Sequence, residues 1–183
     1  MTRILGLSGS LRKGSLNTSL LHEAVRLMPA GGTLDARTLH GVPLYDGDVE
    51  DAEGVPAAVA ELKQALARAD GLLLVTPEYN SGVPGVFKNA IDWMSRGRDG
   101  QAAFAGKPVA LIGASISGFG TISSQDHWLP VLRRLGTRLW TGGQVLVSRA
   151  QDAFDDEGRL KDAATADRLA RFMSDFGAFA ARG

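Results

Sequence analysis

The segment of this chain with the clearest capacity to bind a ligand is a run of mostly small polar residues at positions 8–18. It reads Ser-Gly-Ser-Leu-Arg-Lys-Gly-Ser-Leu-Asn-Thr and follows a short apolar stretch. Where such a run joins a strand to a helix, free backbone N–H groups and the helix dipole favour an anion. A plain turn with a helix cap is the alternative. The hydroxyl groups and the planar, charged guanidinium of an arginine favour a phosphate site instead. Its candidate residues are Ser10, Arg12, Ser15, Leu16, Asn17 and Thr18.

Two common nucleotide-binding motifs do not match this run. Gly9 and Gly14 have the spacing of a Walker loop, but Lys13 precedes the second glycine instead of following it. The Gly-x-Gly-x-x-Gly pattern of dinucleotide-binding folds is also missing after the first apolar stretch. The run therefore favours a monophosphate held by hydroxyl groups over a pyrophosphate or a triphosphate with magnesium.

Two further loops have the composition of a binding site. Residues 76–85 read Thr-Pro-Glu-Tyr-Asn-Ser-Gly-Val-Pro-Gly, where Tyr79 offers an aromatic face that suits a flat heteroaromatic ring. Residues 113–120 contain Ser115, Ser117 and glycines that let the backbone approach a ligand closely. In an open parallel sheet, ligands bind outside the carboxyl ends of the strands, where the strand order reverses. We therefore expect all three loops to form one site.

The elements that position these loops alternate between strand and helix. The apolar patterns predict strands at 3–8, 34–38, 71–76, 108–112 and 145–147, and helices at 16–28, 56–68, 85–96, within 122–135 and around 169–176. Pro130 predicts a kink or a later start in the fourth helix. Repeated strand–helix alternation indicates a doubly wound α/β fold, with a parallel sheet covered by helices on both faces. No linker or repeat interrupts the pattern, so we expect a single domain over residues 1–183.

Composition argues against several other classes of function. The 183 residues include 20 Lys+Arg, 20 Asp+Glu and no cysteine. A formal charge of zero provides no overall field to attract nucleic acid or an anionic membrane, and we expect neither as a partner. Without cysteine, disulfides, thiol nucleophiles and thiolate metal sites are excluded. No signal peptide or membrane-spanning run is visible, so a cytoplasmic location is expected.

Metal-dependent and nucleophilic catalysis lack candidate residues. The three histidines, His22, His40 and His127, share no metal-ligand spacing with one another or with carboxylates. The acidic stretch at 155–158 departs from the calcium-loop pattern. No Gly-x-Ser-x-Gly motif supplies a nucleophile. We therefore name no metal ligand and no catalytic acid, base or nucleophile.

Four stretches of the sequence resemble the NADPH-dependent FMN reductase family, in particular its chromate and quinone reductases. These stretches are 9–17, 76–80, 83–93 and 106–109, and the likeness extends to about residue 150. The resemblance implies a flavodoxin-like fold, with a five-stranded parallel sheet in the order 2-1-3-4-5 and one non-covalent FMN. It assigns the phosphate to the first loop. It assigns the isoalloxazine ring to Pro77, Glu78, Tyr79, Asn80 and Ser81, with Ser115 or Ser117 on the far side.

The resemblance also implies a reaction and an assembly. NADPH or NADH reduces the flavin, leaves, and is replaced by a small-molecule electron acceptor in a ping-pong cycle. Quinones are the expected acceptors, with chromate, azo compounds or free flavin as further ones. A homodimer is expected, with a homotetramer as the alternative, and the wide apolar surface of 85–96 is interpreted as part of the subunit contact or as buried core. The alternative functions are a flavodoxin-type electron carrier and a cofactor-free signalling domain.

Overall fold

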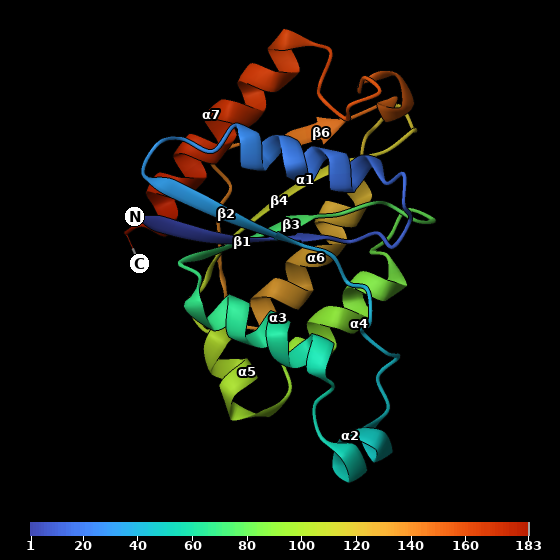
Figure 1. Ribbon diagram of the computed structural model, residues 1–183, viewed down its shortest axis with the longest axis vertical. Helices are drawn as coiled ribbons and strands as arrows, with labels where there is room; N and C mark the ends of the chain where they lie inside the picture. The colour runs from blue at the N-terminus through green and yellow to red at the C-terminus, as the bar shows by residue number, and fades with distance from the viewer. Residues whose placement is uncertain (183) are drawn as a thin grey trace.

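A parallel sheet forms the centre of the computed structural model, which describes residues 1–182 (Figure 1). Its strands are β1 (Thr2–Ser8), β2 (Gly32–Arg37), β3 (Gly71–Val75), β4 (Pro108–Ala114), β5 (Arg138–Leu139) and β6 (Val145–Val147). They lie in the order β2-β1-β3-β4-β5, with β6 also paired to β4. The predicted order 2-1-3-4-5 and the flavodoxin-like doubly wound fold are therefore confirmed, and the order reverses direction between β1 and β3.

The edge of the sheet beyond β4 consists of two short strands where the sequence predicted one. β5 pairs with Pro108 and Val109, whereas β6 pairs with the stretch from Ile112 to Ala114. Residues 140–144 separate the two strands and include adjacent glycines at 142 and 143. The predicted fifth strand at 145–147 corresponds to β6. A strand of two residues has no alternating pattern long enough to be recognised in a sequence.

The helices cover both faces of the sheet, as Figure 1 shows. α1 (Leu16–Arg26) and α7 (Ala163–Ala180) pack on one face, over side chains such as Ile4 and Leu73. On the other face, α3 (Ala57–Arg68), α4 (Gly85–Met94), α5 (Gly97–Phe104) and α6 (Ile122–Arg134) pack over Leu5 and Leu72. Adjacent residues of one strand thus enter different cores, which explains the continuous apolar runs of β3 and β4. Among the helices of residues 1–182, none combines the length and hydropathy needed to cross a bilayer.

Three short elements escaped the sequence prediction: α2 (Gly47–Glu53), α5 and the 3-10 turn η1 (Ala150–Asp152). α2 buries no residue, so it has no apolar stripe to recognise. The predicted helices were found with small shifts at their ends. α6 begins at Ile122 and contains Pro130 in its interior, so the expectation of a later start was wrong.

The wide apolar surface of α4 belongs to the core of its own chain. Phe87, Ala90, Ile91, Trp93 and Met94 are all buried. The Phe87 ring meets the Trp128 ring of α6 edge to face, with centroids 5.0 Å apart. Of the two interpretations of this surface, the structure supports buried core, and these side chains are not available for a subunit contact.

Candidate functional site

The three predicted loops meet at the carboxyl edge of the sheet, where β1, β3 and β4 end. A cleft of about 240 Å³ lies between them. It is lined by nine of the thirteen predicted site residues, which are Ser10, Arg12, Ser15, Leu16, Asn17, Pro77, Glu78, Tyr79 and Ser115. Ala114 and Ile116 complete the lining. Sequence analysis did not select these two because an alanine and an isoleucine carry no recognisable binding chemistry.

The amino end of α1 is arranged to receive an anion. Ser15 caps the helix, with its Oγ accepting from the Thr18 N–H at 3.2 Å. The first turn contains no acidic side chain, which leaves the amides of Leu16 and Asn17 beside the cleft. Arg12 is exposed, and within residues 1–182 it forms no ion pair with a carboxylate. Free amides and an uncommitted guanidinium are the groups that bind a phosphate.

Helix α6, on the other face of the sheet, also begins at this edge, but its amino end already binds the carboxylate of Glu78. Glu78 reaches from the β3–α4 loop and accepts from the Ser124 N–H through Oε2 at 3.0 Å. A carboxylate at a helix N-terminus is favourable because it meets free amides and the positive end of the dipole. Of the two helix N-termini, the one of α1 is therefore the one without a carboxylate from the chain. The bond to Ser124 also gives Glu78 a structural role in addition to its place in the cleft.

Asn17 couples the first loop to the third. Its side-chain amide donates to the Ala114 carbonyl at 2.8 Å and accepts from the Ala114 N–H at 2.9 Å. Both bonds are buried, and together they satisfy a backbone pair at the end of β4. The position predicted to contact phosphate therefore also sets the distance between two walls of the cleft.

Glycine is required where the backbones behind the cleft approach each other. A Cβ added to Gly113 would lie 2.3 Å from the Thr76 carbonyl oxygen and 2.1 Å from the Thr121 Oγ1. Nearby, the buried Thr76 hydroxyl accepts from Trp128 Nε1 at 3.1 Å and lies 2.9 Å from the Ser124 Oγ. This network was not predicted, because its members come from two segments about 50 residues apart, the end of β3 and α6. It holds the second loop against α6.

Tyr79 stands at the cleft because of a tight turn. Tyr79 and Gly82 exchange backbone hydrogen bonds of 3.2 and 3.0 Å, and the two residues between them, Asn80 and Ser81, have φ values of 50° and 59°. Positive φ at both central positions is the geometry of a type I′ turn, and asparagine tolerates it well. The turn leaves the Tyr79 side chain 52% exposed, so its ring is free to contact a ligand.

Four predicted residues lie outside the lining of the cleft. Thr18 is turned toward Ser8, with 2.8 Å between the hydroxyl oxygens. Asn80 and Ser81 form the exposed tip of the turn. Ser117 donates through its Oγ to the Gly120 carbonyl at 3.1 Å. Of the two serines proposed for the third loop, the structure therefore places Ser115 at the cleft.

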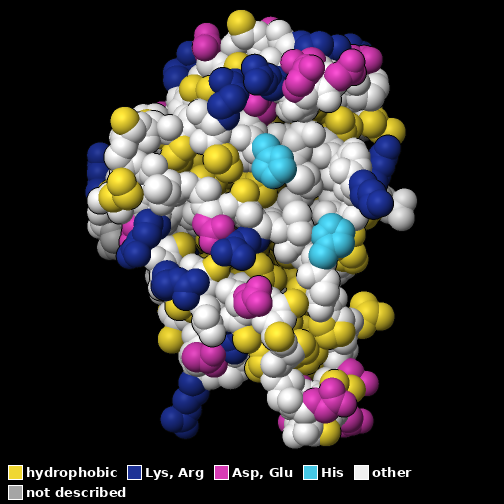
Figure 2. Space-filling model, in the orientation of Figure 1, with side chains coloured by type: hydrophobic (Ala, Val, Ile, Leu, Met, Phe, Trp, Pro, Cys, Tyr) yellow, Lys and Arg dark blue, Asp and Glu magenta, His cyan; other side chains and the backbone are white. Residues whose placement is uncertain are grey.

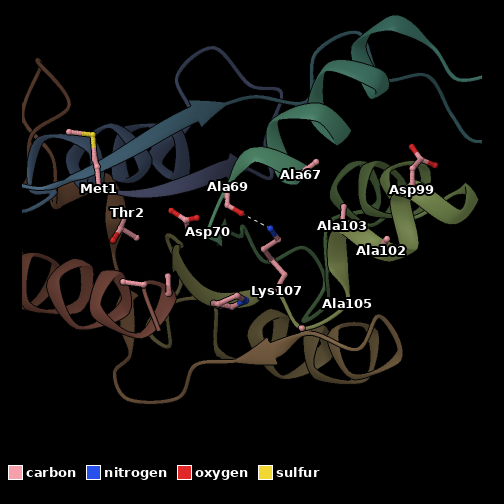
Figure 3. A pocket seen from close by; sticks show the side chains of 14 residues that line it. Met1, Thr2, Ala67, Ala69, Asp70, Asp99, Ala102, Ala103, Ala105 and Lys107 are labelled. Atoms are coloured by element: carbon pink, nitrogen blue, oxygen red, sulfur yellow. Dashed lines mark hydrogen bonds between the residues drawn. The ribbon is translucent and has the colours of Figure 1, made fainter. Parts of the chain in front are cut away.

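A larger cavity, of about 720 Å³, lies at the opposite, amino edge of the sheet (Figure 3). Alanine side chains make up much of its lining. The Lys107 ammonium donates to the Ala69 carbonyl, and the Asp70 carboxylate accepts from the Arg3 N–H at 2.8 Å. Burial lowers the pKa of Lys107, while the charge of Asp70 acts in the opposite direction. The charged groups of Lys107 and Asp70 are thus both bonded to the backbone of their own chain.

Comparison with known proteins identifies the family of the chain. Residues 2–152 match the model of the NADPH-dependent FMN reductase family. The chain belongs to the NADPH-dependent FMN reductase family. An NAD(P)H-dependent FMN reductase of Pseudomonas aeruginosa is 45% identical over 160 residues, covering 87% of this chain and 85% of the relative. A quinone reductase of Escherichia coli is 37% identical over 182 residues, covering 98% of this chain and 96% of the relative.

A solved structure of this group extends the likeness to three dimensions. The flavoenzyme NAD(P)H:(acceptor) oxidoreductase of Paracoccus denitrificans superimposes with a TM-score of 0.86 at 33% identity, covering 100% of this chain and 98% of that one. An FMN-dependent NADH-azoreductase of Bacillus anthracis, solved with FMN, has a TM-score of 0.58 at 15% identity. At that identity the second likeness concerns the fold alone.

One stretch that resembles the FMN reductases, 83–93, serves the scaffold. Asn89 and Trp93 both donate to the Pro43 carbonyl, at 2.8 and 3.0 Å, and Asn89 Oδ1 accepts from the Tyr45 N–H at 2.9 Å. These bonds tether the segment that carries α2, which protrudes from the lower end of the molecule in Figure 1. Acidic side chains gather on this protrusion (Figure 2). The motif therefore positions an exposed arm and contributes nothing to the lining of the cleft.

Proposed function

We propose that this chain is an FMN-dependent NAD(P)H oxidoreductase that reduces quinones. The observation that carries the proposal is one cleft with a free helix N-terminus and Arg12 at one end and a half-exposed Tyr79 at the other. These features suit the two ends of FMN, a phosphate monoester and a flat heteroaromatic ring. Membership of the FMN reductase family, with quinone reductases among the relatives, supports the same cofactor and reaction.

The residues of the cleft divide between the two parts of FMN. Ser10, Arg12, Ser15 and the amides of Leu16 and Asn17 would hold the phosphate, with Thr18 supporting the helix cap. The isoalloxazine ring would lie along the second and third loops, against Pro77, Glu78, Tyr79, Asn80, Ser81, Ser115 and Ser117. When bound without a covalent link, FMN accepts a hydride from a nicotinamide cofactor and passes electrons to an acceptor.

The protein's contribution is binding and orientation. Asn17 keeps the first and third loops at a set separation, and Glu78 is bonded to the start of α6, so both walls are held before a ligand arrives. No catalytic acid or base is assigned. We further propose that NADPH or NADH and the acceptor use the same open cleft in turn, which is the ping-pong order. Chromate, azo compounds and free flavin are proposed as further acceptors.

The first experiment is the visible absorption spectrum of the purified protein, before and after anaerobic addition of NADPH. Flavin bands that bleach on NADPH and return with benzoquinone would support the proposal. Flavin that stays oxidised with both NADPH and NADH would indicate a flavodoxin-type electron carrier. A colourless protein that does not take up FMN would overturn the proposed cofactor and its binding residues.

We propose further that the chain acts as a single domain in the cytoplasm, where NAD(P)H is produced, and that it forms a homodimer. The core of α4 is not available for the contact, but Ile122 and Leu129 of α6 lie seven residues apart and are 41% and 42% exposed. That spacing places both on one face of the helix. Light scattering during gel filtration tests the mass, with a homotetramer as the alternative, and Leu129→Glu should shift the protein toward monomer.

A further inference from the structure

Among the described residues, three that are not glycine have a left-handed backbone, and all three lie at the carboxyl edge. Asn80 and Ser81 occupy the type I′ turn, which explains their conformation. The third is Arg149, with φ 46° and ψ 44°, directly after β6. A bulky side chain in this region strains the backbone, and such strain is found most often at functional sites.

Backbone bonds hold Arg149 beside the third loop of the cleft. Its N–H donates to the Ser117 carbonyl, and the Ala150 N–H donates to the Ser115 carbonyl, both at 3.0 Å. The segment after β6 is therefore hydrogen-bonded to residues 115–117, of which Ser115 lines the cleft, while Arg149 itself lies outside the lining. Asn17 is bonded to Ala114 at the start of the same stretch. An arginine side chain is long and flexible enough to reach a ligand from a segment that adjoins the lining of the cleft.

The charge of Arg149 is not committed to another part of the protein. Its side chain is exposed, and within residues 1–182 the ion pairs involve other cations, namely Arg26, Arg37, Lys63, Lys88 and Arg96. Arg12, which lines the cleft, likewise forms no ion pair among the described residues. Two exposed arginines without an ion pair therefore come from segments at this edge: Arg12 lines the cleft, and Arg149 is bonded through its backbone to the third loop. The α1 N-terminus there already favours an anion.

We propose that Arg149 is a second cation of this site and binds a terminal phosphate monoester. The proposal rests on the proposed function, which brings two such groups to the cleft: the 5′-phosphate of FMN and the 2′-phosphate of NADPH. A guanidinium binds either group through two parallel N–H donors. The strained backbone at Arg149 holds this charge next to the third loop. Residue 149 therefore favours ligand binding and lowers the stability of the folded chain.

The decisive variant is Arg149→Gly, because glycine adopts the left-handed backbone without strain while removing the charge. We expect this variant to melt at the same temperature as the wild type or higher, and to bind a phosphate ligand about tenfold more weakly. Arg149→Lys keeps a charge without the fork and should lie between the two. Arg98→Ala is the matched control and should change neither property, because Arg98 of α5 is exposed and forms no ion pair within residues 1–182.

Two measurements identify the phosphate. If Arg149 binds the FMN phosphate, Arg149→Gly raises the dissociation constant of FMN about tenfold and leaves that of riboflavin, which lacks the phosphate, unchanged. If it binds the 2′-phosphate, FMN affinity is unchanged, while KM for NADPH rises about tenfold and KM for NADH does not. A variant that equals the wild type in all four values overturns the proposal. A wild-type protein that binds no FMN overturns the proposed function, and the role of Arg149 with it.

Discussion

The two edges of the sheet differ in how their polar groups are used. The amino edge has the larger cavity, about 720 Å³, yet its lysine is bonded to the Ala69 carbonyl and its aspartate to the Arg3 N–H. The carboxyl edge has a cleft of about 240 Å³ with free helix amides, an unpaired Arg12 and a half-exposed aromatic ring. The difference teaches that volume alone does not mark a binding site. The carboxyl edge is distinguished by a helix N-terminus and an arginine without an ion pair, next to an exposed aromatic ring.

Backbone geometry separates the edges in the same way. All three left-handed residues other than glycine among residues 1–182 lie at the carboxyl edge. At the amino edge, Gly106 has φ 70°, so the unusual backbone there is carried by the residue type that tolerates it. Strain at one edge and its absence at the other is the pattern expected when only one edge binds a ligand.

The largest effect is expected from adding a methyl group to Gly113 at the carboxyl edge, with Gly106 at the amino edge as the comparison. In Gly113→Ala, the new Cβ meets the Thr76 carbonyl oxygen at 2.3 Å, and backbone cannot move aside cheaply. We expect a loss of about 3 kcal/mol in the free energy of unfolding. In Gly106→Ala, no atom lies within 4 Å, and only the left-handed φ opposes the change, at about 1–2 kcal/mol. Urea unfolding measures both, and equal losses would contradict the close approach at Gly113.

The next effect concerns two asparagines that each bridge a pair of backbone groups. Asn17→Ala leaves the buried N–H and C=O of Ala114 without partners, which should cost about 2–3 kcal/mol and weaken FMN binding. Asn89→Ala is the matched control, because it releases the exposed arm at Pro43 and Tyr45 and leaves the cleft untouched. We expect it to cost about 1 kcal/mol with FMN affinity unchanged. Fluorescence titration with FMN, together with thermal unfolding, distinguishes the two roles.

Removing one cation from each edge should show that Arg12 contributes to FMN binding and Lys107 to the free energy of unfolding. Arg12→Ala should raise the dissociation constant of FMN about 10- to 100-fold, because a charge-assisted contact is lost, while the melting temperature stays the same. Lys107→Met removes the bond to the Ala69 carbonyl, and should lower stability by about 1 kcal/mol with no change in FMN affinity. The assignment of the phosphate to the first loop fails if Arg12→Ala retains FMN with unchanged affinity.

The smallest effect is a pH dependence specific to the amino edge. Burial lowers the pKa of Lys107 from its ordinary value of 10.5, so the folded chain releases this proton at a lower pH than the unfolded chain does. The contribution of Lys107 to stability therefore rises with pH between the lowered pKa and 10.5, by at most about 1.4 kcal/mol per pH unit. Unfolding curves across this window should show the rise in wild type and in Arg12→Ala, and lose it in Lys107→Met.

Long apolar patterns in the sequence predicted the fold. The composition of three loops predicted most of the residues that line the candidate cleft. Continuous apolar runs identified β3 and β4, and the hydroxyl-rich run with Arg12 identified the amino end of α1. In the open parallel sheet these patterns imply, the ends of adjacent strands meet at one edge, so the loops that follow them were expected to converge.

The elements and residues that the sequence did not predict depend on contacts between segments far apart in the chain. α2 and β5 are too short or too polar to show a periodic apolar pattern in the sequence. The segment of α2 is held by its bonds to α4, and β5 is formed by its pairing with β4. Glu78 is a cleft residue whose bond to Ser124 joins segments 46 residues apart. Arg149 carries no local motif, because its significance arises from the backbone angle and from the bonds of its segment to the third loop.

The two ends of the described chain lie at the edge opposite the cleft. Met1 and Ala181 line the same cavity, and Figure 1 places both ends on one side of the sheet. An enzyme anchored to an electrode or fused to a carrier through either end would thus present its cleft outward, away from the support. The same proximity suits a circular permutant, in which a short linker closes the old ends and new ones open in the exposed arm around α2.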